Sequence, residues 1–212
     1  MAGTGLLFAL FVLAHMYGNL KLLVSEQAYN TYAEHLRTFG VPMLPNSGLL
    51  WILRAVLIVA LIVHVYAAVT LWARASGARS VRYAVKKAVA QSASSKTMRW
   101  GGVFILVFLV WHLLEFTIVK IDVSGKGATG NNPYRLVVDS FQTPWLTLIY
   151  VLAMLALYMH LAHGVFSAQQ TLGWTSSART YRQAQIIGHV VAGIVVLGFL
   201  IPPLAILVGL VK

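Results

Sequence analysis

Cysteine is absent from this 212-residue chain, and acidic residues number only five. Without cysteine the chain can form no disulfide, no thiolate-ligated haem, no covalent c-type haem attachment and no cysteine-ligated iron–sulfur cluster. Any iron–sulfur cluster would therefore belong to a partner. Charge is also scarce: charged residues make up 10% of the chain and hydrophobic residues 59%, with a mean hydropathy of +0.78. An average soluble domain has about 25% charged residues, so the composition predicts an integral membrane protein.

Five segments are apolar enough to cross a membrane, which takes about 20 residues for a hydrocarbon core of about 30 Å. They lie near residues 5–24, 49–73, 100–119, 145–168 and 186–211. We predict an all-α integral membrane fold, a bundle of five transmembrane helices forming a single membrane-anchor domain over residues 1–212. Pro202 and Pro203 should kink or end the fifth span. Because Met1 opens almost directly into the first span, we expect a further segment upstream of it.

The net charge of +11 is distributed unevenly between the two sides of the predicted bundle. The loop between the second and third spans is basic and has no acid, and the next loop on that side adds Arg179 and Arg182. All five acids lie on or towards the opposite side. By the positive-inside rule the basic loops face the cytoplasm, so the N-terminus is predicted to be cytoplasmic and the C-terminus outside. The excess of basic residues thus indicates the orientation of the chain in the membrane. The cytoplasmic loops could also dock a partner or bind anionic lipid.

Four of the seven histidines lie one apiece in four of the predicted spans: His15, His64, His112 and His160. An ionisable side chain inside a membrane is rare and indicates a functional site. With the predicted topology, His15 and His112 belong to an outer layer and His64 and His160 to an inner layer. Each layer then has two histidines from two different helices, which is the ligand set that one axially ligated haem needs. We therefore predict two haem b groups, one on each pair.

Small residues near these histidines could let a flat macrocycle lie against the backbone. Ala68 and Gly164 follow an inner histidine by four residues, and Gly18 follows His15 by three. Residues three or four apart share a helix face. Small residues also pack membrane helices together in general, which explains each of them equally well.

The remaining polar residues in or near the spans have two readings each. Glu115 could handle protons near the outer pair or sit at the interface, and Arg54 is expected to reach the outer surface rather than hold a propionate. His35 should be solvated, and His189 should be interfacial, near the inner end of the fifth span. Candidates for a quinone or propionate contact are Arg99, His163, Tyr32, Glu34 and Arg54.

The sequences of the two predicted outer loops differ in how much structure they predict. Residues 25–38 could form a short surface helix. The loop over residues 120–144 is polar and glycine-rich, and it predicts no particular structure.

These residues occur within a set of motifs that resembles a known family. In order along the chain the motifs are Thr4-Gly5, His15-Met16-Tyr17-Gly18-Asn19-Leu20, Leu50-Trp51-Ile52-Leu53-Arg54, His64-Val65-Tyr66-Ala67-Ala68, Met98-Arg99-Trp100-Gly101-Gly102, Trp111-His112, and His160-Leu161-Ala162-His163-Gly164-Val165-Phe166-Ser167 with Gln170-Thr171-Leu172-Gly173. The chain resembles the cytochrome b subunit of succinate dehydrogenase (respiratory complex II), of the single-subunit, five-helix cytochrome b558 type. The resemblance covers almost the whole chain.

The resemblance implies that His15 and His112 bind an outer haem b, and that His64 and His160 bind an inner one. It also implies a flavoprotein subunit and an iron–sulfur subunit on the cytoplasmic side of a bacterial inner membrane. A quinone, with menaquinone expected, would be the substrate in the bilayer. Some relatives have a glutamate two residues before the inner histidine of the fourth span. This chain has Tyr158 there, which puts a transmembrane proton path of that kind in doubt.

Three other functions stay open at this point. The chain could anchor another bacterial redox enzyme, such as a formate dehydrogenase or a hydrogenase. It could be a complex II anchor without haem, assisted by a partner's cluster. A small transporter using histidines as proton relays is a further class, although the inverted repeats or broken helices typical of transporters are not evident.

Overall fold

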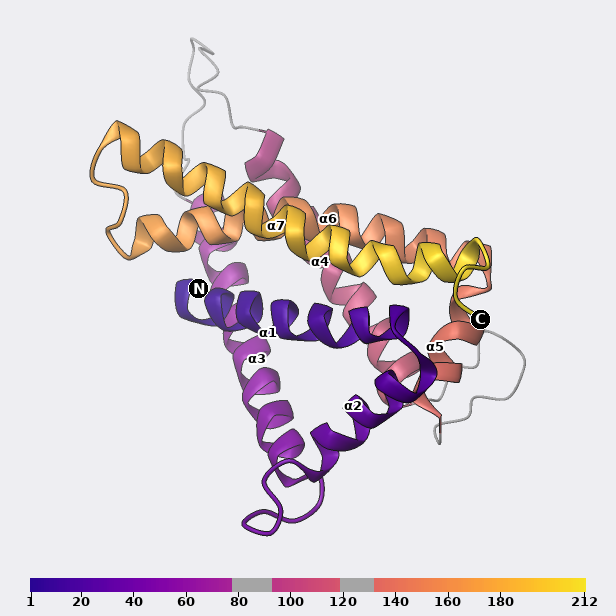
Figure 1. The fold of residues 1–212 in the computed structure, drawn as a ribbon. Helices are drawn as coiled ribbons and strands as arrows, with labels where there is room; N and C mark the ends of the chain where they lie inside the picture. Colours follow the sequence, from indigo (N-terminus) through magenta and orange to yellow (C-terminus); the bar gives the residue numbers. More distant parts are fainter. Residues whose placement is uncertain (78–92, 119–131) are drawn as a thin grey trace.

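The computed structural model describes residues 1–77, 93–118 and 132–212, and within these ranges the chain is helical with no strand (Figure 1). The long helices are α1 (Ala2–Leu20), α3 (Gly48–Gly77), α4 (Ala93–His112), α6 (Pro144–Thr171) and α7 (Ala178–Leu207). Shorter elements are η1 (Lys21–Leu23), α2 (Glu26–Thr38), η2 (Leu113–Thr117) and α5 (Pro133–Phe141). Five helices are long and apolar enough to span a membrane: Ala2–Leu23, Gly48–Ala75, Met98–Thr117, Pro144–Thr171 and Ala178–Leu207. The predicted fold class is confirmed.

Helices α6 and α7 form an antiparallel pair, and α1 packs against both of them (Figure 1). The helices approach closely where glycine removes the side chain. A Cβ at Gly188 would overlap the main-chain oxygen of Ala162, and a Cβ at Gly198 would overlap the Met16 side chain. Ala192 and Val195 are fully buried between these helices. Small residues at such crossings let membrane helices pack by direct backbone approach.

Helix α3 is the most exposed of the spans. It packs on α1 and, near Gly48, on α2, while its far end meets α4 through a Trp72–Trp100 ring contact at 5.9 Å. In Figure 1 it crosses the direction of α1, α6 and α7 steeply. Most of its apolar side chains are open to the surroundings, as expected of a helix that faces lipid.

The predicted fifth span is shifted. Helix α7 begins at Ala178, eight residues earlier than predicted, because Ser177 and Thr180 form a capping box ahead of a polar first turn. It ends at Leu207, four residues earlier, and Gly209 has a φ of +78° just beyond. Pro202 and Pro203 are buried inside the helix and do not end it there. Membrane helices tolerate interior proline where neighbouring groups satisfy the freed carbonyls.

Two short helices cover the end of the bundle where α1 stops. The predicted surface helix is confirmed as α2, whose Ser25 side chain accepts a hydrogen bond from the Ala28 N–H. The loop for which no structure was predicted contains α5, capped by Asn132 and begun by Pro133. Tyr134, Val137, Val138 and Phe141 of α5 are buried against residues of α6 and α7.

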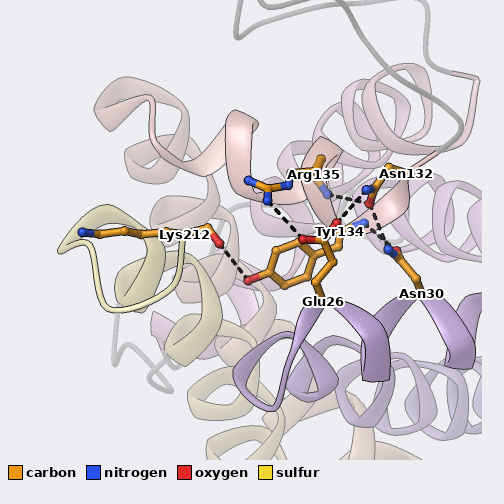
Figure 2. Close-up of polar contacts among 6 residues, drawn as sticks. All are labelled: Glu26, Asn30, Asn132, Tyr134, Arg135 and Lys212. Carbon is orange, nitrogen blue, oxygen red and sulfur yellow. Dashed lines mark hydrogen bonds and ion pairs between the residues drawn. The ribbon is translucent and has the colours of Figure 1, made fainter.

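Figure 2 shows how α2 and α5 are joined by polar contacts. Asn132 donates to Glu26 at 2.8 Å and accepts from Asn30 at 3.0 Å, and Arg135 pairs with Glu26 at 3.1 Å. Tyr134 donates its hydroxyl to the main-chain oxygen of Lys212 at 3.1 Å. The two helices of the cap are therefore joined to each other, and α5 is joined to the C-terminal residue.

Candidate functional site

The structure brings together His15 of α1 and His112, the last residue of α4. Their ring centroids are 5.9 Å apart and the ring planes differ by 80°. Aromatic rings surround them: Phe11 stacks on His15 at 5.5 Å, while Phe108 and Phe116 lie 5.9 and 5.5 Å from His112. We call His15 and His112 the outer pair, after the predicted topology.

The second predicted pair, His64 and His160, also lies together and is called the inner pair. Its ring centroids are 6.3 Å apart, with 59° between the planes, and the pair bridges α3 and α6. Two glycines make room for it. A Cβ at Gly5 would lie 3.7 Å from His64 Cε1, and a Cβ at Gly102 would lie 3.4 Å from His160 Cε1.

The two pairs lie at different levels of the bundle. Thr4 contacts the inner pair, because its Oγ1 is 3.0 Å from His64 Nδ1. His15 follows on the same helix eleven residues later, which corresponds to about 16 Å along the axis at 1.5 Å per residue. The layered arrangement predicted from sequence is therefore present in the structure.

Hydrogen bonding fixes the tautomer of His64. The single hydroxyl hydrogen of Thr4 is donated to the main-chain oxygen of Met1 at 3.0 Å. Thr4 Oγ1 must then accept from His64, so Nδ1 is the protonated nitrogen of the imidazole. The lone pair is left on Nε2.

The same logic applies to His112. Tyr150 donates its hydroxyl hydrogen to Glu115 Oε2 at 3.1 Å, and the Tyr150 oxygen is 3.1 Å from His112 Nδ1. Nδ1 of His112 therefore donates to Tyr150, and Nε2 carries the lone pair. Metal-binding histidines almost always have their second nitrogen held in this way.

The distances within both pairs fit two imidazoles on opposite sides of one metal ion. A metal–imidazole nitrogen bond is about 2.0–2.1 Å, and a ring nitrogen lies about 1.1 Å from its centroid, so collinear ligands have centroids about 6 Å apart. His160 Nδ1 is buried and has no hydrogen-bond partner among the described residues. The donor sets, two imidazoles each and no thiolate, match bis-histidine haem ligation.

The glycines expected beside a macrocycle divide into two cases. Gly164 has open space around its Cβ position, as the prediction requires. Gly18 does not, because a Cβ there would lie 2.7 Å from the Tyr32 ring. Gly18 thus serves the packing of α2 onto α1, which is the second of the two readings that its sequence position allows.

Glu115 is the one acid fully buried among the described residues, at 1% exposure. It lies in η2, a π turn directly after His112 in which the Ile118 N–H donates to Leu113 O at 2.8 Å. Its Oε2 accepts hydrogen bonds from Trp111 and Tyr150, whereas Oε1 has no partner among the described residues. Glu115 is therefore inside the bundle, two residues from the end of the membrane-spanning segment Met98–Thr117.

The other sequence candidates lie apart from the histidine pairs. Arg54 is exposed over the Trp51 ring at 4.9 Å, which agrees with an outward-reaching side chain, and Arg99 is exposed over Trp72 at 5.5 Å. His163 is half-buried against Phe166 at 6.2 Å. Tyr32 packs against Gly18 and Tyr17.

Glu34 lines a polar cavity of about 360 Å³ between α2 and the start of α5. Outside α2 the cavity is bounded by Asn46, Asn132 and Pro133. Amide groups and a guanidinium, from Asn30, Arg37 and Asn132, thus converge on a space large enough for a small ring.

His189 lies on the exposed surface of α7. Because α7 begins at Ala178, His189 lies eleven residues into the helix, about 16 Å from its start. It is exposed on the bundle surface and 3.0 Å from the Tyr158 hydroxyl. Tyr158 is thus hydrogen-bonded to α7.

Sequence reasoning missed Tyr150 as a partner of the outer pair. It is 38 residues from His112 in the chain, and no spacing rule connects the two. The helix α5 was also missed, although Asn132-Pro133 is a helix-start signal and its apolar residues recur at helical spacing.

The basic loop predicted to contact partners lies mostly outside the described residues; Arg79, Arg82, Lys86 and Lys87 belong to that segment. Compared with known proteins, the chain matches no protein-family model, no curated protein and no solved structure.

Proposed function

We propose that this chain is the membrane-anchoring cytochrome b subunit of a succinate:quinone oxidoreductase in a bacterial inner membrane. In this proposal a partner iron–sulfur subunit, reduced by a flavoprotein subunit, delivers electrons that reach a quinone in the bilayer. The observation that carries the proposal is the pairing of four histidines from four helices, at two levels, with ring separations of 5.9 and 6.3 Å.

The four histidines of the two pairs would hold the two haem b groups. His15 and His112 would bind one, and His64 and His160 the other; when bound, the haems supply reversible one-electron transfer. Thr4 and Tyr150 fix the tautomers of His64 and His112, so that Nε2 is presented without rearrangement. The surrounding phenylalanines exclude water from the outer pair.

The ends of the bundle suggest where partners and substrate meet the chain. Arg74, Arg99, Arg179 and Arg182 are exposed and come from helix ends on the predicted cytoplasmic side. A basic surface there favours docking of an acidic partner face. At the opposite end, the polar cavity lined by Glu34 and Arg37 offers donors for a quinone carbonyl, and we place the quinone head group there.

The test is a redox-titrated absorbance spectrum of the purified complex, with pyridine-haemochrome quantification per chain. We expect two b-type haems with separate midpoint potentials. His64→Ala should remove one haem and uncouple succinate oxidation from quinone reduction. His189→Ala is the matched control, since His189 lies on α7 outside both pairs, and it should keep two haems. A wild-type complex without haem, or equal haem loss in both variants, would overturn the proposal.

A further inference from the structure

The buried carboxyl group of Glu115 is the least explained polar group near the histidines. Removing a charged carboxyl group from water costs several kcal/mol unless it is paired, and no cation is seen beside Glu115 among the described residues. Its neighbours are neutral hydrogen-bonding groups, the side chains of Trp111, Tyr150 and the buried Ser140, and Oε1 makes no hydrogen bond of good geometry with the described residues. Burial of the Glu115 carboxyl group is unfavourable, and η2 is a π turn of the kind often found at functional sites. Both observations indicate that Glu115 has a function.

The hydrogen bonds around Glu115 lead to one histidine only. Trp111 Nε1 donates to Oε2 at 3.1 Å, Tyr150 donates to the same oxygen at 3.1 Å, and Tyr150 in turn accepts from His112 Nδ1 at 3.1 Å. The chain of bonds runs in one direction, from the imidazole through the hydroxyl to the carboxyl group. Hydrogen bonds in series polarise one another, so donation to Glu115 makes the Tyr150 oxygen a better acceptor.

The inner pair has no equivalent arrangement among the described residues. There the hydroxyl of Thr4 also accepts from a histidine, but it passes its hydrogen to a neutral main-chain oxygen of Met1. His112 is therefore connected to a carboxyl group, and His64 to a carbonyl group. The two pairs, alike in their ring separation, differ in the acceptor behind the hydroxyl.

Packing keeps this connection rigid. The Tyr150 ring is buried, at 8% exposure, with Phe108 and Phe141 each 4.8 Å away. Phe141 belongs to α5, whose own position is fixed by the contacts of Figure 2. The cap formed by α2 and α5 thus holds Tyr150 in place above His112.

We propose that Glu115, acting through Tyr150, is a positioning residue that holds His112 and makes it a stronger electron donor than His64. The proposal rests on the proposed function, in which His112 is an axial ligand of the outer haem. A hydrogen bond from the far nitrogen raises the basicity of a metal-bound imidazole. A more basic ligand favours the oxidised metal, so the outer haem should have its midpoint potential lowered by Glu115 and Tyr150.

The experiment compares midpoint potentials of both haems in the purified complex of three variants. Tyr150→Phe keeps the buried ring but removes the acceptor of His112, and Glu115→Gln keeps an amide oxygen that accepts more weakly than a carboxylate. Tyr158→Phe is the matched control. It removes a tyrosine hydroxyl from the same helix, α6, and breaks a Tyr–His hydrogen bond of similar length, 3.0 Å, whose histidine is His189.

We expect Tyr150→Phe to raise the midpoint of the outer haem alone. A tenfold change in the relative affinity of His112 for the two iron oxidation states corresponds to about 59 mV for a one-electron couple. Glu115→Gln should give a smaller rise of the same sign, and Tyr158→Phe none, with two haems retained in every variant.

The other outcomes distinguish a failure of the proposed function from a failure of the positioning role of Glu115 and Tyr150. If wild type contains no haem, the proposed function fails. If wild type contains two haems and Tyr150→Phe leaves both potentials unchanged, the positioning role fails while the proposed function stands. If Tyr150→Phe shifts the potential and Glu115→Gln does not, the hydroxyl acts alone and the assignment of Glu115 is overturned. A fall in both potentials in either variant would indicate a general loosening of the bundle, and would likewise overturn it.

Discussion

Two adjacent glycines in the middle of α4 offer a sharp test of the inner pair. A Cβ at Gly102 would lie 3.4 Å from Cε1 and 3.7 Å from Nδ1 of His160, whereas a Cβ at Gly101 would meet nothing within 4 Å. Carbon atoms attract best at about 3.5–4.0 Å, so Gly102→Ala would make an ordinary contact and should be tolerated. Gly102→Val adds two more carbons, and its χ1 is nearly fixed in a helix, so they cannot rotate freely away.

The expected effect of Gly102→Val follows from overpacking. Extra carbons in a packed site cost about 1–3 kcal/mol. At 1.4 kcal/mol per factor of ten, that corresponds to about 5- to 150-fold weaker retention of a group held by His160. Under limiting haem, we expect one haem per chain in Gly102→Val, with the outer spectrum intact.

The assay is pyridine-haemochrome quantification together with a reduced-minus-oxidised spectrum of each variant. Gly101→Val and Gly102→Ala are the controls, and both should keep two haems. Two haems with an unchanged spectrum in Gly102→Val would refute the reasoning, because the valine would then fit beside His160. An equal loss in Gly101→Val would also refute it, since the effect would come from α4 as a whole.

Two further predictions concern the helix packing and the cap. Gly188→Ala should lower the unfolding free energy by about 1–3 kcal/mol, because its Cβ would overlap the Ala162 oxygen. Gly193→Ala on the same helix meets nothing within 4 Å and should leave the thermal midpoint in detergent unchanged or raise it, so equal midpoints would contradict the packing argument. Burial, with a smaller contribution from Tyr32, raises the pKa of Tyr29 from 10.0 to about 12. The folded protein then holds this proton more tightly than the unfolded chain, so the associated stability is complete below pH 10 and is lost as the pH rises from 10 to 12. The loss is at most about 2–3 kcal/mol at 1.36 kcal/mol per unit. Thermal midpoints of wild type and Tyr29→Phe should diverge between pH 9 and pH 11.5, and parallel curves would exclude this role of Tyr29.

The spans and the histidine pairs could be predicted because both follow from local sequence. Hydropathy identifies a membrane helix, and alternating direction of the spans converts residue number into depth, which placed His15 with His112 and His64 with His160. Hydropathy failed at Ala178, where a capping box starts a helix that is still polar. The surroundings of the outer pair could not be predicted, because Tyr150 and Glu115 meet His112 only after α4 and α6 have packed.

Each histidine pair takes one member from each side of the segment between residues 77 and 93: His15 and His64 precede it, and His112 and His160 follow it. Neither half of the chain on its own therefore contains a complete site. During synthesis the outer site becomes complete once α4 has entered the membrane, and the inner site only after α6 has followed. A group held by both members of a pair can therefore bind only after the later of the two helices has been made, and the pair of His15 and His112 is complete first.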